Sequence, residues 1–413
     1  MKYMRRALMG VAVIALCTDV MYQGSTAWAD GQRRPVLYEF IEQVTVEHPA
    51  LKASEAALSA ARARAKGRSR PIYNPELAVG YENATEVTKE VGLAQTFDWS
   101  GKRNARTNVG LAEVEAAEAA YDIRKKALVT EILQALANYQ TASQLYKVAM
   151  ERENLSSQFL EFSMQRHKAG EIPQAELLTA RLTLAEARAS MNDALLSLSA
   201  AEEILTATVG KERNFWPRLD GAPLQTVVGA EQSDYAKLPE LRFAQAQSEI
   251  ARAQIKVAKT DRIPDPTVGI RLGEEGRSSL VGLSASIPLP IRNSYKDAVD
   301  AAGSVYLEAQ QNYYAENRRV QARYDASLKR YLSASKAWSL WQDQGAEPLG
   351  RQRELLSKLL EARQIGVLDY LVQLNQTFAT EIASIELNGR LWNTWFAWQD
   401  ASATVDEWLE TIK

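Results

Sequence analysis

The sequence repeats one series of segments, and this internal duplication constrains the possible folds more than any other feature. The first copy contains the segments His48-Pro49-Ala50-Leu51, Asn74-Pro75-Glu76-Leu77 and Val91-Gly92-Leu93. The second copy contains, in the same order, Leu238-Pro239-Glu240-Leu241, Asp265-Pro266-Thr267-Val268 and Val281-Gly282-Leu283. Because the matching segments stay about 190 residues apart, we infer that one structural unit is used twice.

The duplication predicts a simple division of the chain. Residues 1–29 form a signal peptide, 30–208 the first repeat, 209–237 an irregular linker, and 238–413 the second repeat. Each repeat is expected to contain a helix, a β-hairpin and a long helical pair.

Long helices should make up most of each repeat. Between residues 103 and 168 there is no proline, and apolar residues recur at spacings of three and four, as in Val129, Ile132 and Leu136. A straight helix of this length would extend roughly 100 Å, which is longer than a compact globular domain needs. A turn at 169–173 should lead to a returning helix at 174–208.

The second repeat departs from the first at one point. Gly345, Pro348 and Gly350 predict a bend in its long helix that the first repeat lacks. Gly366 then marks the turn that corresponds to 169–173.

A short hairpin precedes each helical pair. Leu77, Val79 and Tyr81 alternate with polar or small residues, as expected of a strand with one apolar face. The same alternation occurs at 91–99, 268–272 and 281–287, and the polar stretches 83–88 and 274–279 separate the strands.

The N-terminus has the features of an export signal. It combines basic residues within 1–6, an apolar core at 7–16 and the sequence Ala27-Trp28-Ala29, which together predict a mature chain that begins at Asp30. The single cysteine, Cys17, lies inside this segment. Lipidation at Cys17 is the alternative, but Leu16 stands where a lipoprotein signal would have a small residue.

The composition argues against several classes of function. Charges of both signs are mixed and the formal net charge is -2, so no nucleic-acid partner is predicted. Without the signal segment there is no cysteine, and the two histidines are far apart, which leaves little material for a metal site or a catalytic histidine. Because no Gly-rich phosphate loop is present either, we predict no enzyme activity and no cofactor.

Two isolated hairpins cannot stand in a membrane. Each would leave unpaired backbone groups in hydrocarbon, at several kcal/mol per group. Three chains that each contribute four strands would instead close a twelve-stranded barrel, with the tips at 83–88 and 274–279 outside the cell. The predicted fold class is therefore mainly α with a small β part: a long α-helical barrel plus a membrane β-barrel assembled from a trimer.

The motifs resemble those of a known family. The resemblance rests on the segments Asn74-Pro75-Glu76-Leu77, Gln95-Thr96-Phe97-Asp98-Trp99-Ser100-Gly101-Lys102-Arg103 and Ile287-Pro288-Leu289-Pro290, together with the paired Gly turns. In order and duplication these segments are similar to the TolC-like outer membrane efflux family, and in detail to its CzcC-like heavy-metal branch. The resemblance implies a passive homotrimeric channel in outer membrane lipid, with a large periplasmic part. It also implies two partners, a periplasmic adaptor protein and an inner-membrane RND-type pump.

The resemblance further implies roles for residues near the two helical turns. Gly170 and Gly366 are candidates for contact with the adaptor, although both would also serve as ordinary helix C-caps. Glu176 and Asp369 are candidates for an acidic ring at the periplasmic aperture, with a solvated carboxylate as the alternative. In the second turn Arg363 precedes the glycine, whereas the family commonly has an arginine after it.

Two further groups have a plain structural interpretation. The helical spacing of Trp392, Trp395 and Trp398 favours packing within a periplasmic helix over an aromatic belt at a membrane surface. For His167 near the first turn, an ordinary exposed side chain is favoured over a pH sensor or a metal ligand.

Other functions remain open at this stage. A periplasmic coiled-coil adaptor would also be exported and helical, but it would lack the two duplicated hairpins. A drug or type I secretion duct of the same family would share every feature. The sequence does not identify the transported substrate, because a wide, water-filled duct does not need to bind it tightly.

Overall fold

The structure, a computed structural model, describes residues 37–213, 215–220, 223, 237–361 and 365–411. The predicted signal peptide, most of the linker and Arg363 lie outside the described residues. In chain order the elements are α2 (Leu37–Glu47), α3 (Pro49–Arg68), β1 (Glu76–Asn83), β2 (Val87–Thr96), α4 (Lys102–Lys168), α5 (Gln174–Val209), α6 (Pro239–Asp261), β3 (Thr267–Glu275), β4 (Ser278–Ser286), α7 (Lys296–Gln344), α8 (Ala346–Glu361), α9 (Val367–Ser402) and α10 (Val405–Thr411).

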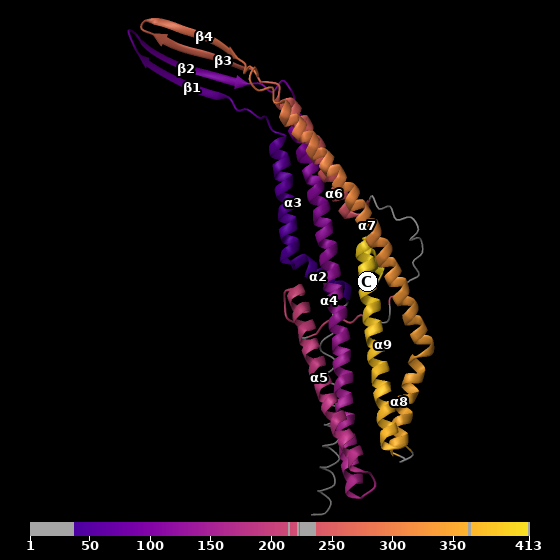
Figure 1. Cartoon of the computed structure of the whole chain (residues 1–413). Helices are drawn as coiled ribbons and strands as arrows, with labels where there is room; N and C mark the ends of the chain where they lie inside the picture. Colours follow the sequence, from indigo (N-terminus) through magenta and orange to yellow (C-terminus); the bar gives the residue numbers. More distant parts are fainter. Residues whose placement is uncertain (1–36, 214, 221–222, 224–236, 362–364, 412–413) are drawn as a thin grey trace, which may run out of the picture.

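The described elements form a long, narrow body with the strands at one end (Figure 1). The helix α4, with 67 residues, runs through most of the helical part, and α3, α5, α6 and α9 pack along it. The turn between α4 and α5, and the adjoining ends of α8 and α9, lie at the end away from the strands. The predicted fold class of the chain, mainly helical with a small β part, is confirmed.

Local signals set several helix boundaries. The helix α3 begins where His48 Nδ1 accepts a hydrogen bond from the Ala50 backbone N–H at 3.2 Å, with Pro49 in the first turn. His48 Nε2–H donates to the Thr208 carbonyl oxygen at 3.1 Å, which links the start of α3 to the end of α5. The helix α7 ends next to Gly345 and α8 follows directly, so the predicted bend in the second repeat is confirmed. Among the helices that the structure describes, none combines the length and the apolar character needed to cross a membrane.

The four strands form one antiparallel sheet in the order β1-β2-β3-β4. The pairs β1–β2 and β3–β4 are the two predicted hairpins, and the pairing of β2 with β3 joins the repeats. The strands reach further into the tips than the polar stretches predicted, because the β3–β4 turn consists of Gly276 and Arg277 alone. Gly276 has a φ of 59°, the left-handed conformation that such a tight turn requires.

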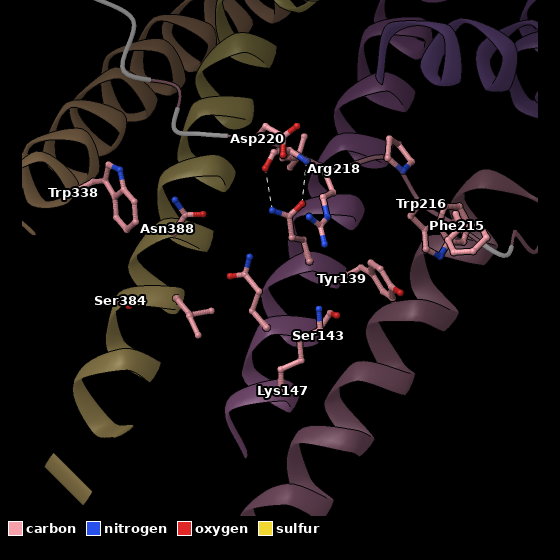
Figure 2. A pocket seen from close by; sticks show the side chains of 15 residues that line it. Tyr139, Ser143, Lys147, Phe215, Trp216, Arg218, Asp220, Trp338, Ser384 and Asn388 are labelled. Atoms are coloured by element: carbon pink, nitrogen blue, oxygen red, sulfur yellow. Dashed lines mark hydrogen bonds between the residues drawn. The ribbon is translucent and has the colours of Figure 1, made fainter. Parts of the chain in front are cut away.

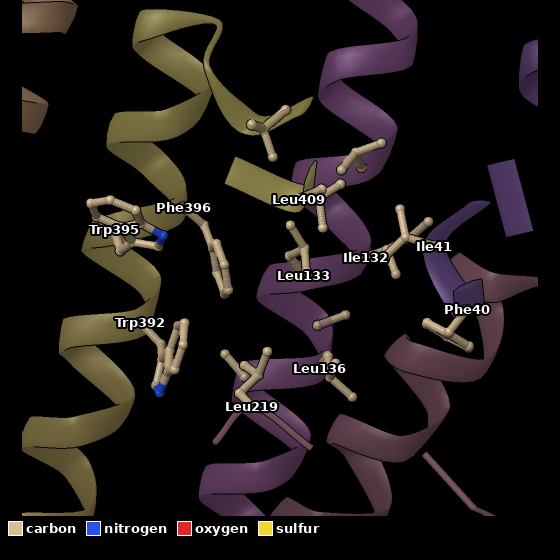
Figure 3. Packing of buried hydrophobic residues seen from close by; sticks show 14 of the residues in the cluster. Phe40, Ile41, Ile132, Leu133, Leu136, Leu219, Trp392, Trp395, Phe396 and Leu409 are labelled. Atoms are coloured by element: carbon tan, nitrogen blue, oxygen red, sulfur yellow. The ribbon is translucent and has the colours of Figure 1, made fainter. Parts of the chain in front are cut away.

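The larger hydrophobic core lies midway along the helices, between α4, α9 and the short helices α2 and α10 (Figure 3). Its largest buried side chains include Phe40, Leu128, Ile132, Leu133, Leu136, Tyr331, Trp395 and Phe396. Tyr331 stacks on Trp398 with ring centroids 5.7 Å apart. Trp392, Trp395 and Trp398 are all buried in this core, which confirms the prediction that they pack within the helical part.

A second core lies near the helical turns. Phe159 of α4 stacks on Tyr370 of α9 with ring centroids 5.7 Å apart, and Ile172 and Phe378 are buried in the same cluster. Burial raises the pKa of the Tyr370 hydroxyl. This cluster therefore joins the helical pair of the first repeat to that of the second.

Candidate functional site

The sheet has two chemically different faces, which the pairing register identifies. The apolar face carries side chains that are exposed in the single chain, namely Leu77, Val79, Tyr81, Val91, Leu93, Val268, Ile270, Leu272, Val281 and Leu283. The polar face carries Glu76, Ala78, Gly80, Glu82, Thr88, Glu90, Gly92, Ala94, Thr96, Thr267, Gly269, Arg271, Gly273, Glu275, Ser278, Leu280, Gly282, Ser284 and Ser286. Val79 and Leu283 are each 80% exposed, and a continuous apolar surface of this kind marks contact with lipid or with another protein.

Exposed apolar side chains continue beyond the strands toward the helices. Phe97 and Trp99 follow β2, and Leu289 and Ile291 follow β4; all four are exposed. Trp99 Nε1–H donates to the Pro264 carbonyl oxygen at 2.8 Å, so its polar end is held while its ring stays exposed. An aromatic ring with one polar end suits the boundary between membrane and water.

A buried ion pair joins the two repeats where strands and helices meet. Lys102 Nζ lies 2.7 Å from Asp265 Oδ2, and both side chains are buried. The Tyr73 hydroxyl donates to the same carboxylate oxygen at 2.8 Å, and this hydrogen bond raises the pKa of Tyr73. Lys102 and Asp265 both belong to motifs seen in the sequence, but they are 163 positions apart and no local pattern predicts their contact.

A second charged cluster connects α4, α6, α7 and α9. Lys126 Nζ lies 2.5 Å from Glu240 Oε1 and 3.8 Å from Asp400 Oδ1, and Arg323 forms ion pairs with both acids. Burial lowers the pKa of Lys126, against the opposing effect of Glu240. The two cations and two acids balance in formal charge, with Arg323 contributing from a more exposed position, and the cluster connects four helices.

A hollow of 580 Å³ opens between α4, α9 and the segment 215–220 (Figure 2). Gln140 holds this segment through two hydrogen bonds of 3.0 Å: its Nε2 donates to the Leu219 carbonyl oxygen, and its Oε1 accepts from the Leu219 N–H. Trp216 packs edge-on against Phe40 and Tyr139. The hollow is thus formed where the connection between the repeats docks on the helices. Within the described part of the chain, no group of three or more His, Cys, Asp or Glu side chains is placed to hold a metal ion.

The first helical turn is built around Gly170, whose φ is 76°. The Gly170 N–H donates to the His167 carbonyl oxygen and the Glu171 N–H donates to the Arg166 carbonyl oxygen, both at 2.9 Å. These two bonds form a Schellman C-cap. His167 Nδ1–H donates to the Ile172 carbonyl oxygen at 3.0 Å. His167 is therefore a half-buried part of the turn, and the prediction of an ordinary exposed side chain was wrong.

The second turn uses its glycine differently. Gly366 has a φ of -67° and a ψ of 150° and is the N-cap of α9, so the expected C-cap role holds for Gly170 and is wrong for Gly366. Glu176 and Asp369 occupy matching places, each as the third residue of its helix. A carboxylate in the first turn interacts favourably with the positive end of the helix dipole. Both acids therefore interact favourably with the dipoles of their own helices, independently of the proposed aperture.

Comparison with known proteins finds relatives that are similar in sequence. A family model described as outer membrane efflux protein matches residues 40–211. The cobalt-zinc-cadmium resistance protein CzcC of Cupriavidus metallidurans is 24% identical over 352 residues, which cover 83% of this chain and 82% of the relative. The nickel-cobalt-cadmium resistance protein NccC of Alcaligenes xylosoxydans xylosoxydans is 29% identical over 316 residues, which cover 71% of this chain and 68% of the relative.

Solved structures show the same fold. A crystal structure of CusC, whose description refers to transmembrane channel formation, has a TM-score of 0.72 at 17% identity. The match covers 91% of this chain and 94% of the CusC chain. The Campylobacter jejuni CmeC outer membrane channel has a TM-score of 0.71 at 15% identity, and the match covers 88% of this chain and 85% of the CmeC chain.

The predicted resemblance to the outer membrane efflux proteins is confirmed by these similarities of sequence and fold. The two relatives named for metal resistance match the predicted likeness to the heavy-metal branch. The predicted location, the outer membrane with a large helical part in the periplasm, is that of this class. The matched proteins are described as efflux, resistance and channel proteins, in agreement with the prediction that the chain is not an enzyme.

Proposed function

We propose that this chain is the outer membrane channel of a tripartite efflux system, in which a homotrimer conducts substrates passively from the periplasm or a pump to the exterior. The observation that carries the proposal is the four-stranded sheet at the end of a long helical body. One face of this sheet is exposed and apolar, as a lipid-facing surface must be.

The sheet of one chain supports the trimer. In the order β1-β2-β3-β4, the strands β1 and β4 form the two edges, and edges in hydrocarbon must find backbone partners. Pairing of β4 with β1 of the next copy satisfies both edges, and three copies close a twelve-stranded barrel wide enough for a channel. The apolar face then meets lipid and the polar face lines the water-filled lumen.

The end of the molecule opposite the strands is the proposed binding surface for the partner proteins. The two helical turns lie furthest from the strands, where an adaptor protein of an inner-membrane RND-type pump would meet the channel. We place the adaptor contact at Gly170 and Gly366, because both turns expose small residues there. Glu176 and Asp369, one helical turn inside, are proposed to line the periplasmic aperture.

The assembly has a direct test based on the edge strands. With Cys17 replaced, a Val79→Cys, Val281→Cys chain carries one thiol on each edge strand, separated within one chain by β2 and β3. In detergent-extracted outer membranes, a short bismaleimide should convert this variant to covalent trimers, while each single variant should stay uncrosslinked. Recovery of the protein from the periplasm without detergent, as an uncrosslinked monomer, would remove the channel proposal.

For the substrate we propose divalent heavy-metal cations, on the strength of the CzcC and NccC relatives. A strain that lacks this chain should become sensitive to cobalt, nickel, zinc or cadmium salts, and the gene in trans should restore growth. Sensitivity to hydrophobic drugs with unchanged metal tolerance would assign the channel to drug efflux instead.

A further inference from the structure

Glu90, on the polar face of β2, lies between two glycines. Its register partners are Gly80 of β1 and Gly273 of β3. A Cβ atom at Gly80 would lie 2.8 Å from Glu90 Cγ and 3.1 Å from Oε1. The Glu90 side chain therefore lies flat over β1, in space that any larger residue at position 80 would need.

Arg271, on the polar face of β3, has matching surroundings. Its register partners are Gly92 of β2 and Gly282 of β4. A Cβ atom at Gly92 would lie 3.0 Å from Arg271 Cγ, and one at Gly282 would lie 3.6 Å from Nε. Arg271 Nη1 lies 3.5 Å from Glu90 Oε2. The two long side chains thus form a cross-strand ion pair that lies along the sheet instead of projecting from it.

Stability does not explain this arrangement. The Arg271 and Glu90 side chains are 51% and 27% exposed, and an exposed ion pair contributes little to the free energy of unfolding. Glycine weakens a strand, because it loses more backbone freedom on folding and packs no side chain. At Gly80, Gly92 and Gly282 a Cβ atom would first meet side-chain atoms of the pair, whereas at Gly273 it would first meet the Lys89 carbonyl oxygen. Glycine at the first three positions weakens the sheet more than one exposed pair strengthens it, so the stability of the sheet does not account for them.

The other charges of the sheet indicate what the polar face does. The remaining charged residues of the polar face are all acidic, namely Glu76, Glu82 and Glu275. Within the described strands, Arg271 is therefore the only cation on this face. On the apolar face Lys89 and Glu274 are also register partners of opposite charge, at the end of the strands next to the turns.

We infer that Glu90 and Arg271 are specificity-determining residues of the exit pore for hydrated cations. The inference rests on the proposed function, because it requires the polar face to line the lumen of the trimer. Three pairs then lie at one level of an otherwise acidic wall. Because both side chains lie flat over glycines, they leave the lumen open. Arg271 weakens the attraction of the acidic wall for cations, so that cations can both enter and leave the pore.

The test is the reversal potential of single trimers in planar bilayers under a KCl gradient. Arg271→Gln should raise the permeability of K⁺ relative to Cl⁻ by a factor of roughly two to five, because it leaves only acids on the wall. Glu90→Gln should lower this ratio. Lys89→Gln removes the same charge type from the matched pair on the opposite face, and it should leave the ratio at the wild-type value.

The outcomes separate the two proposals. Wild-type trimers that form no channels would overturn the proposed function. Channels with the same selectivity in wild type, Arg271→Gln and Glu90→Gln would overturn this inference and leave the proposed function standing. A shift in Lys89→Gln as large as that in Arg271→Gln would also overturn it, because the assignment of faces would be wrong. If Arg271→Gln fails to assemble on a gel, the Glu90→Gln measurement decides alone.

Discussion

Gly170 and Gly366 occupy corresponding turns of the two repeats, but their backbones differ. Gly170 has a φ of 76°, in the left-handed region, and its N–H completes a Schellman C-cap. Gly366 has a φ of -67° and a ψ of 150°, an extended conformation that any residue adopts. Only the first turn therefore requires glycine for its backbone, although both positions are proposed to meet the adaptor.

This difference predicts that substitution by alanine destabilises the first turn but has little effect on the second. Gly170→Ala should cost roughly 1–2 kcal/mol of local stability, because alanine is strained in the left-handed region. Gly366→Ala should change stability by less than about 0.5 kcal/mol, since the lower entropy of the unfolded chain offsets the poorer N-cap. Limited proteolysis near residues 166–172 should accelerate in Gly170→Ala alone. Equal proteolysis and equal thermal midpoints in the two variants would contradict the geometry of the first turn.

At the scale of elements, the sequence predicted the features that are set by residues close together in the chain. The period-two alternation located both hairpins, and Gly345 located the break between α7 and α8. The two faces of each strand also followed from this alternation. These features are local, because each is fixed by residues within a few positions of one another.

Contacts between distant elements were not predictable from such patterns. The pairing of β2 with β3 and the buried contact of Lys102 with Asp265 join segments from different repeats. The register also places Glu90 and Arg271 each between two glycines, which the alternation within one strand does not reveal. The only sequence signal for this pair is that each charged residue stands opposite glycines when the hairpin strands are aligned.

At the scale of the whole molecule, charge is placed at both ends of the proposed conduit. The ion pair of Glu90 and Arg271 lies on the sheet, and the carboxylates of Glu176 and Asp369 lie near the helical turns at the far end. Between them, Lys126 and Arg323 balance the charges of Glu240 and Asp400 where four helices meet. In a trimer, the two ends would act in series on an ion that passes through.

The far end can be tested separately from the exit. Three copies of Glu176 and Asp369 in a narrow ring would attract cations, and the protein walls would focus that field. The double variant Glu176→Gln, Asp369→Asn should therefore lower the permeability of K⁺ relative to Cl⁻ and weaken block by multivalent cations, while trimers still assemble. Glu171→Gln is the matched control, because Glu171 lies in the same turn with its carboxylate 2.9 Å from Arg166 Nε. If the double variant and this control both conduct like the wild type, Glu176 and Asp369 act only on the dipoles of their own helices and do not form an aperture.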